Sequence, residues 1–113
     1  MHELPVTENL LEIALRHASQ AGATRIIHLN LVIGQFASIV DESVQFYWEI
    51  VSKNTPAEGS CLHFTHLPAE LYCLDCQQTY KPANGELTCP ICLGARVKIL
   101  TGKEFYLESI EIE

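Results

Sequence analysis

Basic residues are scarce in this sequence. The 113-residue chain has 7 lysines and arginines against 14 aspartates and glutamates, which gives a formal net charge of −7. The basic residues are scattered along the chain, whereas proteins that bind nucleic acids gather lysine and arginine on one surface to contact phosphates. The composition therefore speaks against a nucleic-acid-binding function and favours attraction of cations or of a basic protein partner.

Long apolar segments are also missing. No hydrophobic run approaches the length of about 20 residues that a membrane-spanning helix needs, and residues 1–5 have neither the basic nor the apolar region of a signal peptide. Hydrophobic residues nevertheless make up 48% of the chain, which is ordinary for a folded protein. We therefore expect a cytoplasmic protein with reduced thiols, folded as one compact domain with a small insert.

The dominant motif is a pair of Cys-x-x-Cys sequences, Cys73–Cys76 and Cys89–Cys92, separated by twelve residues. This spacing is typical of a structural zinc site with four thiolate ligands. Each pair is expected to make a tight turn, and the loop with Pro82, Asn84 and Gly85 is expected to fold back as a hairpin that brings the pairs together. Four thiolates would fill a tetrahedral shell, so the metal would stabilise structure and catalyse no reaction.

Other interpretations of the cysteines stay open at this point. Two disulfides would leave the fifth cysteine, Cys61, unpaired, and the missing signal peptide argues against an oxidising compartment. A thioredoxin-type redox pair accounts for one Cys-x-x-Cys motif but not for two. An iron site of the rubredoxin type would use the same four ligands, because ligand geometry alone does not separate iron from zinc. Zinc is the interpretation that the spacing favours.

Two segments have the hydrophobic spacing of amphipathic helices. The first is expected over residues 6–21, with Thr7 as its N-cap and Gly22 as its C-terminal stop. The second is expected over residues 41–52, where Asp41 would act as the N-cap. The inward face of the second helix is expected to carry Val44, Tyr47, Trp48 and Val51.

Three segments are expected to form strands, at residues 24–33, 61–67 and 104–113. The economical arrangement is an α+β fold, with a three-stranded sheet, two helices on one face and an inserted small zinc-ribbon-like domain. His63 and His66 would point to opposite faces of their strand, so a single metal site holding both is not expected.

The predicted domain boundaries follow from the place of the insert. Residues 1–68 and 101–113 would form the α/β domain, and residues 69–100 would form the zinc-binding domain. The insert leaves and re-enters the sheet between the last two strands. We therefore expect those two strands to be adjacent and paired, since the ends of the insert must lie close together.

The N-terminus carries a second candidate metal site. The amine of Met1, the backbone and ring nitrogens of His2 and the backbone nitrogen of Glu3 can surround a metal ion in one plane. Nitrogen donors in a square plane suit Ni(II) or Cu(II), and deprotonated amide nitrogens would make such binding strongly pH-dependent. The alternative from these residues alone is an inert chain end.

Several short motifs, in order along the whole chain, resemble the HypA/HybF family of nickel metallochaperones in hydrogenase maturation. They are Met1-His2-Glu3, Ile33-Gly34, Ala57-Glu58-Gly59, the paired cysteines and Ser109-Ile110-Glu111-Ile112. The resemblance implies an α/β nickel domain carrying a small zinc domain. It implies Ni(II) bound at the N-terminus through His2 and the neighbouring main chain. The zinc ligands that it implies are Cys73, Cys76, Cys89 and Cys92.

The resemblance also implies roles for two carboxylates and shows one departure. Glu3 would orient His2 or contact a partner, and Asp41 matches a position that adds a carboxylate to the nickel in some members. Some members have a histidine shortly after each cysteine pair, whereas this chain has Gln77-Gln78 and Leu93-Gly94 there. An exchange of cysteine for histidine ligands is therefore not supported.

The resulting hypothesis is a non-enzymatic carrier that delivers Ni(II) to the large-subunit precursor of a [NiFe]-hydrogenase. The resemblance implies a HypB-type GTPase as partner and, in some organisms, service to urease maturation proteins. An alternative is a zinc-ribbon interaction adaptor that transports no metal. A zinc hydrolase is excluded if all four cysteines bind the ion, because no coordination position is left for substrate.

Overall fold

The computed structural model describes residues 3–82 and 87–113, which form two compact units. The helical unit contains the described residues as far as Val32, together with Ser38–Thr65 and Tyr106–Glu113. The cysteine unit contains Ile33–Ala37 and His66–Phe105. Part of the predicted cysteine-loop hairpin, with Asn84 and Gly85, lies outside the described residues.

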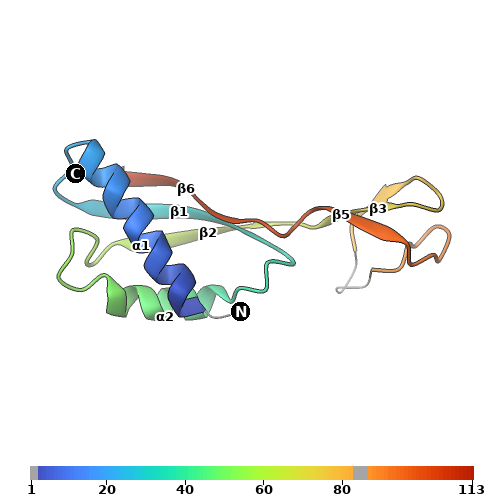
Figure 1. Cartoon of the computed structure of the whole chain (residues 1–113), viewed down its shortest axis with the longest axis horizontal. Coiled ribbons are helices and arrows are strands. Elements are labelled where there is room, and N and C mark those ends of the chain that lie inside the picture. The colour runs from blue at the N-terminus through green and yellow to red at the C-terminus, as the bar shows by residue number, and fades with distance from the viewer. Residues whose placement is uncertain (1–2, 83–86) are drawn as a thin grey trace. The chain divides into compact units, whose positions relative to one another are not determined.

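Two helices and two small sheets make up the described chain, which confirms the predicted α+β class (Figure 1). In chain order the elements are α1 (Glu3–Gln20), β1 (Ile26–Gly34), α2 (Asp41–Val51), β2 (Cys61–Leu67), β3 (Glu70–Cys73), β4 (Thr79–Tyr80), β5 (Val97–Thr101) and β6 (Phe105–Ile112). One sheet has the strand order β2-β1-β6, and the other has the order β4-β3-β5. Within the described residues, neither helix is long and apolar enough to cross a bilayer.

Helix α1 begins at Glu3, earlier than the sequence predicts. The predicted N-cap role of Thr7 is wrong, because its Oγ1 donates to the carbonyl oxygen of Glu3 at 2.7 Å, four residues back inside the helix. Thr7 is fully buried, and this internal hydrogen bond satisfies its hydroxyl. The predicted stop is confirmed, since Gly22 has φ +71° and the N–H of Ala23 donates to the carbonyl oxygen of Ala18 at 2.9 Å. This is the pattern of a Schellman C-cap, which favours glycine.

Helix α2 begins at Asp41, but Asp41 is not its N-cap. Val40 occupies that position with φ −97° and ψ 117°, and its side chain makes no capping hydrogen bond. The carboxylate of Asp41 instead accepts the N–H of Glu42 at 2.9 Å. The N-cap role that the sequence predicted for Asp41 is therefore wrong. The inward face is confirmed at Val44 and Trp48, which are buried in the helical unit.

Strand β1 is the central strand of the β2-β1-β6 sheet. Its side chains Leu29, Leu31 and Ile33 are buried. The central position suits β1 because its sequence is the most apolar of the three strands in this sheet. The expected pairing of the last two strands is therefore wrong, since β2 and β6 each neighbour β1 rather than one another.

The ends of the insert are joined by their own strand pair. Strands β3 and β5 run antiparallel, with Leu71 opposite Ile99 and Cys73 opposite Val97. Leu71 and Cys73 are fully buried. The chain that leads into the first cysteine pair is thus hydrogen-bonded to the chain that follows the second pair, a pairing that the sequence analysis did not predict.

Two glycines allow close backbone packing at the base of the cysteine unit. The N–H of Phe36 donates to the carbonyl oxygen of Gly102 at 2.6 Å. A Cβ on Gly34 would lie 2.2 Å from that same oxygen, and Gly102 itself has φ +119°. Any larger residue at either position would force the backbones apart.

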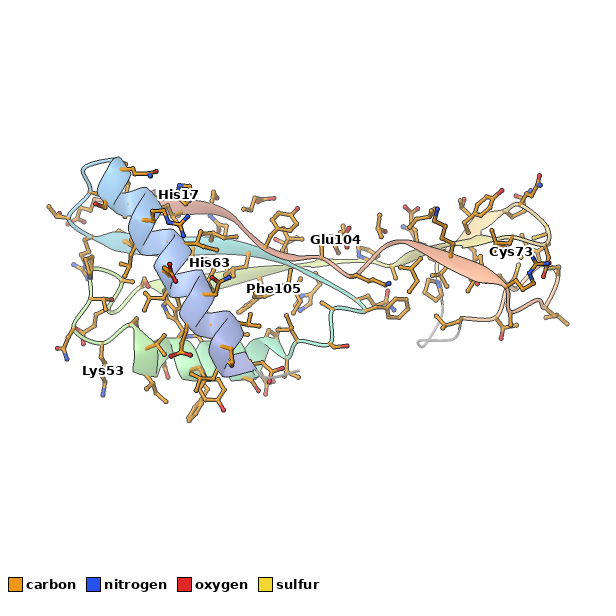
Figure 2. All side chains as sticks on the ribbon, in the orientation of Figure 1. His17, Lys53, His63, Cys73, Glu104 and Phe105 are labelled. Carbon is orange, nitrogen blue, oxygen red and sulfur yellow. The ribbon has the colours of Figure 1, made fainter. Side chains whose placement is uncertain are left out.

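The carboxylate of Glu104 closes the same turn and predicts a pH effect on stability. Its Oε1 accepts the N–H of Gly102 at 2.6 Å (Figure 2). Backbone hydrogen bonds hold the pKa of this carboxyl below its usual value of 4.5. The N–H of Gly102 has the largest effect, and those of Glu104 and Lys103 add to it. Because the folded pKa is lowered, the stabilisation is present above pH 4.5 and is lost as the pH falls through the folded pKa.

We therefore expect Glu104→Gln to destabilise the chain at neutral pH, and the difference from the unmodified chain to shrink as the pH falls below 4.5. Urea unfolding at a series of pH values measures this difference. Glu108→Gln is the matched control, because Glu108 is an exposed glutamate on β6. A difference for Glu104→Gln that stays constant over the whole pH range would contradict the role given to its carboxylate.

Candidate metal centres

The four cysteines of the two Cys-x-x-Cys motifs come together in the cysteine unit. Cys73 ends β3, Cys76 follows in the next turn, and Cys89 and Cys92 lie in the segment before β5. All four Sγ atoms lie within 4.8 Å of one another. Two pairs join different motifs, with Sγ–Sγ distances of 3.5 Å for Cys73 and Cys92 and 3.6 Å for Cys76 and Cys89.

This arrangement fits a tetrahedral metal ion. With Zn–S bonds of about 2.3 Å, the sulfurs of a regular tetrahedron are separated by about 3.8 Å, close to the two short separations. A disulfide would need an S–S distance of about 2.05 Å, and all of these cysteines are free thiols. Four soft thiolate ligands suit Zn(II) or iron and leave no open coordination position.

The two motifs fold as near copies of each other. The residue after each pair has a left-handed backbone, with φ 58° at Gln77 and 60° at Leu93. The N–H of Gln77 donates to the carbonyl oxygen of Cys73, and the N–H of Leu93 donates to that of Cys89, both at 2.9 Å. These local hydrogen bonds are the physical reason why a Cys-x-x-Cys sequence aims two sulfurs at one point.

The thiols differ in their tendency to ionise. Hydrogen bonds from the backbone N–H groups of Cys92 and Ile91 lower the pKa of the Cys89 thiol to about 7. Burial, followed by hydrogen bonds with the other three thiols, raises the pKa of Cys76 to about 12. Four adjacent thiolates need a cation to offset their repulsion, so metal binding to this cluster must displace protons.

Residue 94, after the second cysteine pair, has little room for a larger side chain. A Cβ on Gly94 would lie 2.7 Å from Oδ2 of Asp75 and 3.3 Å from the sulfur of Cys92. The same Asp75 pairs through Oδ1 with Nη1 of Arg96 at 3.1 Å. The departure noted at Leu93-Gly94 is therefore consistent with the packing, which favours glycine at residue 94.

The predicted nickel residues lie only partly in the described chain. Met1 and His2 are outside the described residues. Glu3 is the first residue of α1, and its Oε2 accepts the N–H of Val40 at 3.4 Å. Asp41 follows Val40 directly and begins α2. The start of α1 thus lies near α2 (Figure 1), and Glu3 contacts the residue that directly precedes Asp41.

Sequence reasoning missed one pair of potential ligands. His28 on β1 and His63 on β2 meet across the neighbouring strands, with 2.9 Å between Nδ1 of His28 and Nε2 of His63. The strand order, which places β2 beside β1, brings the two side chains together. His63 and His66 are both exposed on β2, and their placement on opposite faces stays a prediction from the strand alternation.

Comparisons with known proteins agree along the whole chain. A family model described as hydrogenase/urease nickel incorporation, metallochaperone, hypA matches residues 1–112. Hydrogenase maturation factor HypA of Dehalococcoides mccartyi is 41% identical over 113 residues, covering 100% of this chain and 95% of that protein. Hydrogenase maturation factor HybF of Escherichia coli K12 is 35% identical over 113 residues, covering 100% of both chains.

Solved structures show the same similarity. The solution structure of the Ni metallochaperone HypA from Helicobacter pylori matches with a TM-score of 0.69 and 26% identity, covering 99% of this chain and 97% of that one. A second solution structure, of a HypA protein, matches with a TM-score of 0.74 and 25% identity, covering 100% of this chain and 97% of that one.

Proposed function

Because this chain belongs to the HypA family of nickel metallochaperones in hydrogenase maturation, we propose that it binds Ni(II) at its N-terminus and delivers the ion for insertion into a [NiFe]-hydrogenase large subunit. The observation that carries the proposal is the extent of the family match, which begins at residue 1 and so includes the Met-His-Glu start. The family consists of maturation factors, and the nickel ion is cargo rather than a catalytic cofactor.

The proposed nickel ligands are the amine of Met1, the backbone and ring nitrogens of His2 and the backbone nitrogen of Glu3. The start of α1 at Glu3 supports this set. The first four N–H groups of a helix have no partner within the helix, so the amide of Glu3 is available without breaking the helical hydrogen bonds. A site at the chain end can also be offered to an acceptor without unfolding the carrier.

The carboxylates of Glu3 and Asp41 have supporting roles in this proposal. The hydrogen bond from Val40 to Glu3 ties the first turn of α1 to the start of α2. This contact would hold the nickel residues beside Asp41, whose carboxylate is a further candidate ligand. Nitrogen donors with an added carboxylate oxygen remain compatible with Ni(II) and Cu(II).

Zinc is proposed to be structural, held by Cys73, Cys76, Cys89 and Cys92. The separation of the four sulfurs and their thiol chemistry support this assignment. In this proposal residues 69–100 form the zinc-binding domain, and residues 1–68 and 101–113 form the nickel-binding domain. Free thiols of this kind persist in the cytoplasm, where we place the protein.

The proposed partners are other components of hydrogenase maturation. They are a HypB-type GTPase, which would cooperate in loading, and the hydrogenase large-subunit precursor, with urease maturation proteins as further acceptors. A nitrogen-rich site follows the Irving–Williams order and prefers Cu(II) to Ni(II) in free competition. Selectivity for nickel would therefore depend on docking to these partners and on the scarcity of free copper.

The proposal predicts that His2→Ala removes the tightest Ni(II)-binding step of the zinc-loaded chain. The substitution takes away the ring nitrogen, and a few extra residues before Met1 should have the same effect because they remove the free amine. Calorimetric Ni(II) titration measures both changes, with zinc content determined in parallel.

His17→Ala is the matched control, because His17 is an exposed histidine on α1. Tight Ni(II) binding that survives both His2→Ala and the N-terminal extension would overturn the proposal. That result would favour the alternative of a zinc-ribbon adaptor without transported metal.

A further inference from the structure

We propose that His28 and His63 together bind a divalent transition-metal ion, Cu(II) or Ni(II), on the surface of the three-stranded sheet. This second site goes beyond the proposed function at the N-terminus and uses different residues. Both histidines belong to the helical unit and lie on the neighbouring strands β1 and β2. His63 is exposed and His28 is half-buried, so an ion can reach the pair from solvent.

The two rings present nitrogen atoms to each other. Nε2 of His63 and Nδ1 of His28 are 2.9 Å apart, and the ring centroids are separated by 4.9 Å at an interplanar angle of 47°. In the metal-free pair one nitrogen donates a proton and the other accepts it. If the donating ring moves that proton to its other nitrogen, both facing nitrogens carry free lone pairs, and no proton leaves the protein.

The separation of the nitrogens selects the class of metal. An ion at about 2.05 Å from each nitrogen would bind with an N–metal–N angle of about 90°. That is the angle between adjacent ligands in square-planar and octahedral complexes, which Cu(II) and Ni(II) favour. A tetrahedral Zn(II) ion would need the nitrogens about 3.3 Å apart, so the pair must open before it fits zinc.

The pair has polar neighbours, although Ile26 and Val32, which share the alternation of His28 along β1, are buried. Two residues along β1, Asn30 donates through Nδ2 to Oγ of Ser109 on β6 at 3.0 Å. On β2 the residue before His63, Leu62, is buried and therefore faces the other way. The exposed edge of the pair at His63 thus lets a bound ion keep part of its water shell.

The site has few fixed ligands. Among the described residues, the cysteine cluster is the one group of three or more histidine, cysteine or acidic side chains close enough to share an ion. The histidine pair therefore supplies two ligands and leaves the remaining positions to water or to a group from another molecule. Such a site binds weakly and exchanges quickly, which suits transient holding of an ion. The net charge of −7 adds a general attraction for cations.

The test uses four forms of the full zinc-loaded chain, which are the unmodified protein, His2→Ala, His63→Gln and the double variant. Each is titrated with Cu(II) and with Ni(II) alone, and the imidazole NMR signals are followed. In the His2→Ala background, we expect added Cu(II) to broaden the signals of His28 and His63. Adding His63→Gln should weaken this binding by at least about tenfold, because one of two fixed ligands is lost.

His66→Gln in the same background is the matched control, since His66 is exposed on the same strand with the opposite alternation. It should leave the binding unchanged. Equal affinity with and without His63, or no Cu(II) binding at all in the His2→Ala background, would show that the pair is an inter-strand hydrogen bond only. The N-terminal proposal is judged separately, from the effect of His2→Ala in the chain that retains His63. Fluorescence of the single tryptophan confirms folding in every variant.

Discussion

Replacing Cys89 with serine is expected to abolish stoichiometric zinc binding and to unfold the cysteine unit. In the part of this unit that the structure describes, few apolar residues are buried, and two of them are themselves cluster cysteines. The buried apolar residues of this unit are Ile33, Ala37, Ala69, Leu71, Cys73 and Cys89. A core of this size does not hold a unit together by itself. The binding of a structural zinc ion contributes about 10–16 kcal/mol in small zinc-binding domains, so its loss exceeds any local packing effect here.

Metal analysis of the purified Cys89→Ser chain measures the zinc, and backbone NMR signals of the β3–β5 pair report on the cysteine unit. Cys61→Ser is the matched control, because Cys61 is an exposed free thiol outside the cluster. It should retain one zinc ion per chain. A full equivalent of zinc in Cys89→Ser, with intact β3–β5 signals, would contradict the proposed ligand set.

Replacing Trp48 with alanine is expected to lower the stability of the helical unit by about 3–5 kcal/mol. Trp48 is 1% exposed and has the largest of the fully buried side chains in the described chain. Its indole N–H donates to Oγ of Ser60 at 3.0 Å, and the Ser60 hydroxyl donates in turn to the carbonyl oxygen of Ala57 at 2.5 Å. The substitution removes the ring and leaves a large space between α2 and the segment before β2.

Urea unfolding followed by circular dichroism measures this loss on zinc-loaded protein. Phe46→Ala is the matched control on the same helix, since Phe46 is 59% exposed. Its ring packs edge-on against Tyr47 with a centroid distance of 5.3 Å, so we expect a loss of about 1 kcal/mol or less. A loss below about 1.5 kcal/mol for Trp48→Ala would show that this ring is not central to the core.

The elements that sequence reasoning placed well are those whose signals are local. The strand at Cys61–Leu67 agrees with the prediction at both ends, and α2 agrees to within one residue. Gly22 stops α1 as predicted because a left-handed residue at a helix C-terminus depends on its immediate neighbours. The start of α1 was predicted too late because Thr7 was treated as a cap, whereas burial and its hydrogen bond to Glu3 place it inside the helix.

The errors and omissions concern contacts between distant segments. The order β2-β1-β6 separates the strands on either side of the insert. The reason is that β1, the most apolar of the three strands, takes the central position. The contact of Glu3 with Val40 and that of His28 with His63 join residues 37 and 35 positions apart. Neither contact leaves a pattern that can be found along the chain.

The sequence by itself determined the α+β class, the family and the grouping of the cysteines, because periodicity, motif order and Cys-x-x-Cys turns depend on neighbouring residues. Only the tertiary structure decided which strand is central, that the ends of the insert pair as β3 and β5, and which histidines meet. Those outcomes depend on the free energy of packing one segment against another, and that free energy is shared among residues far apart in the chain.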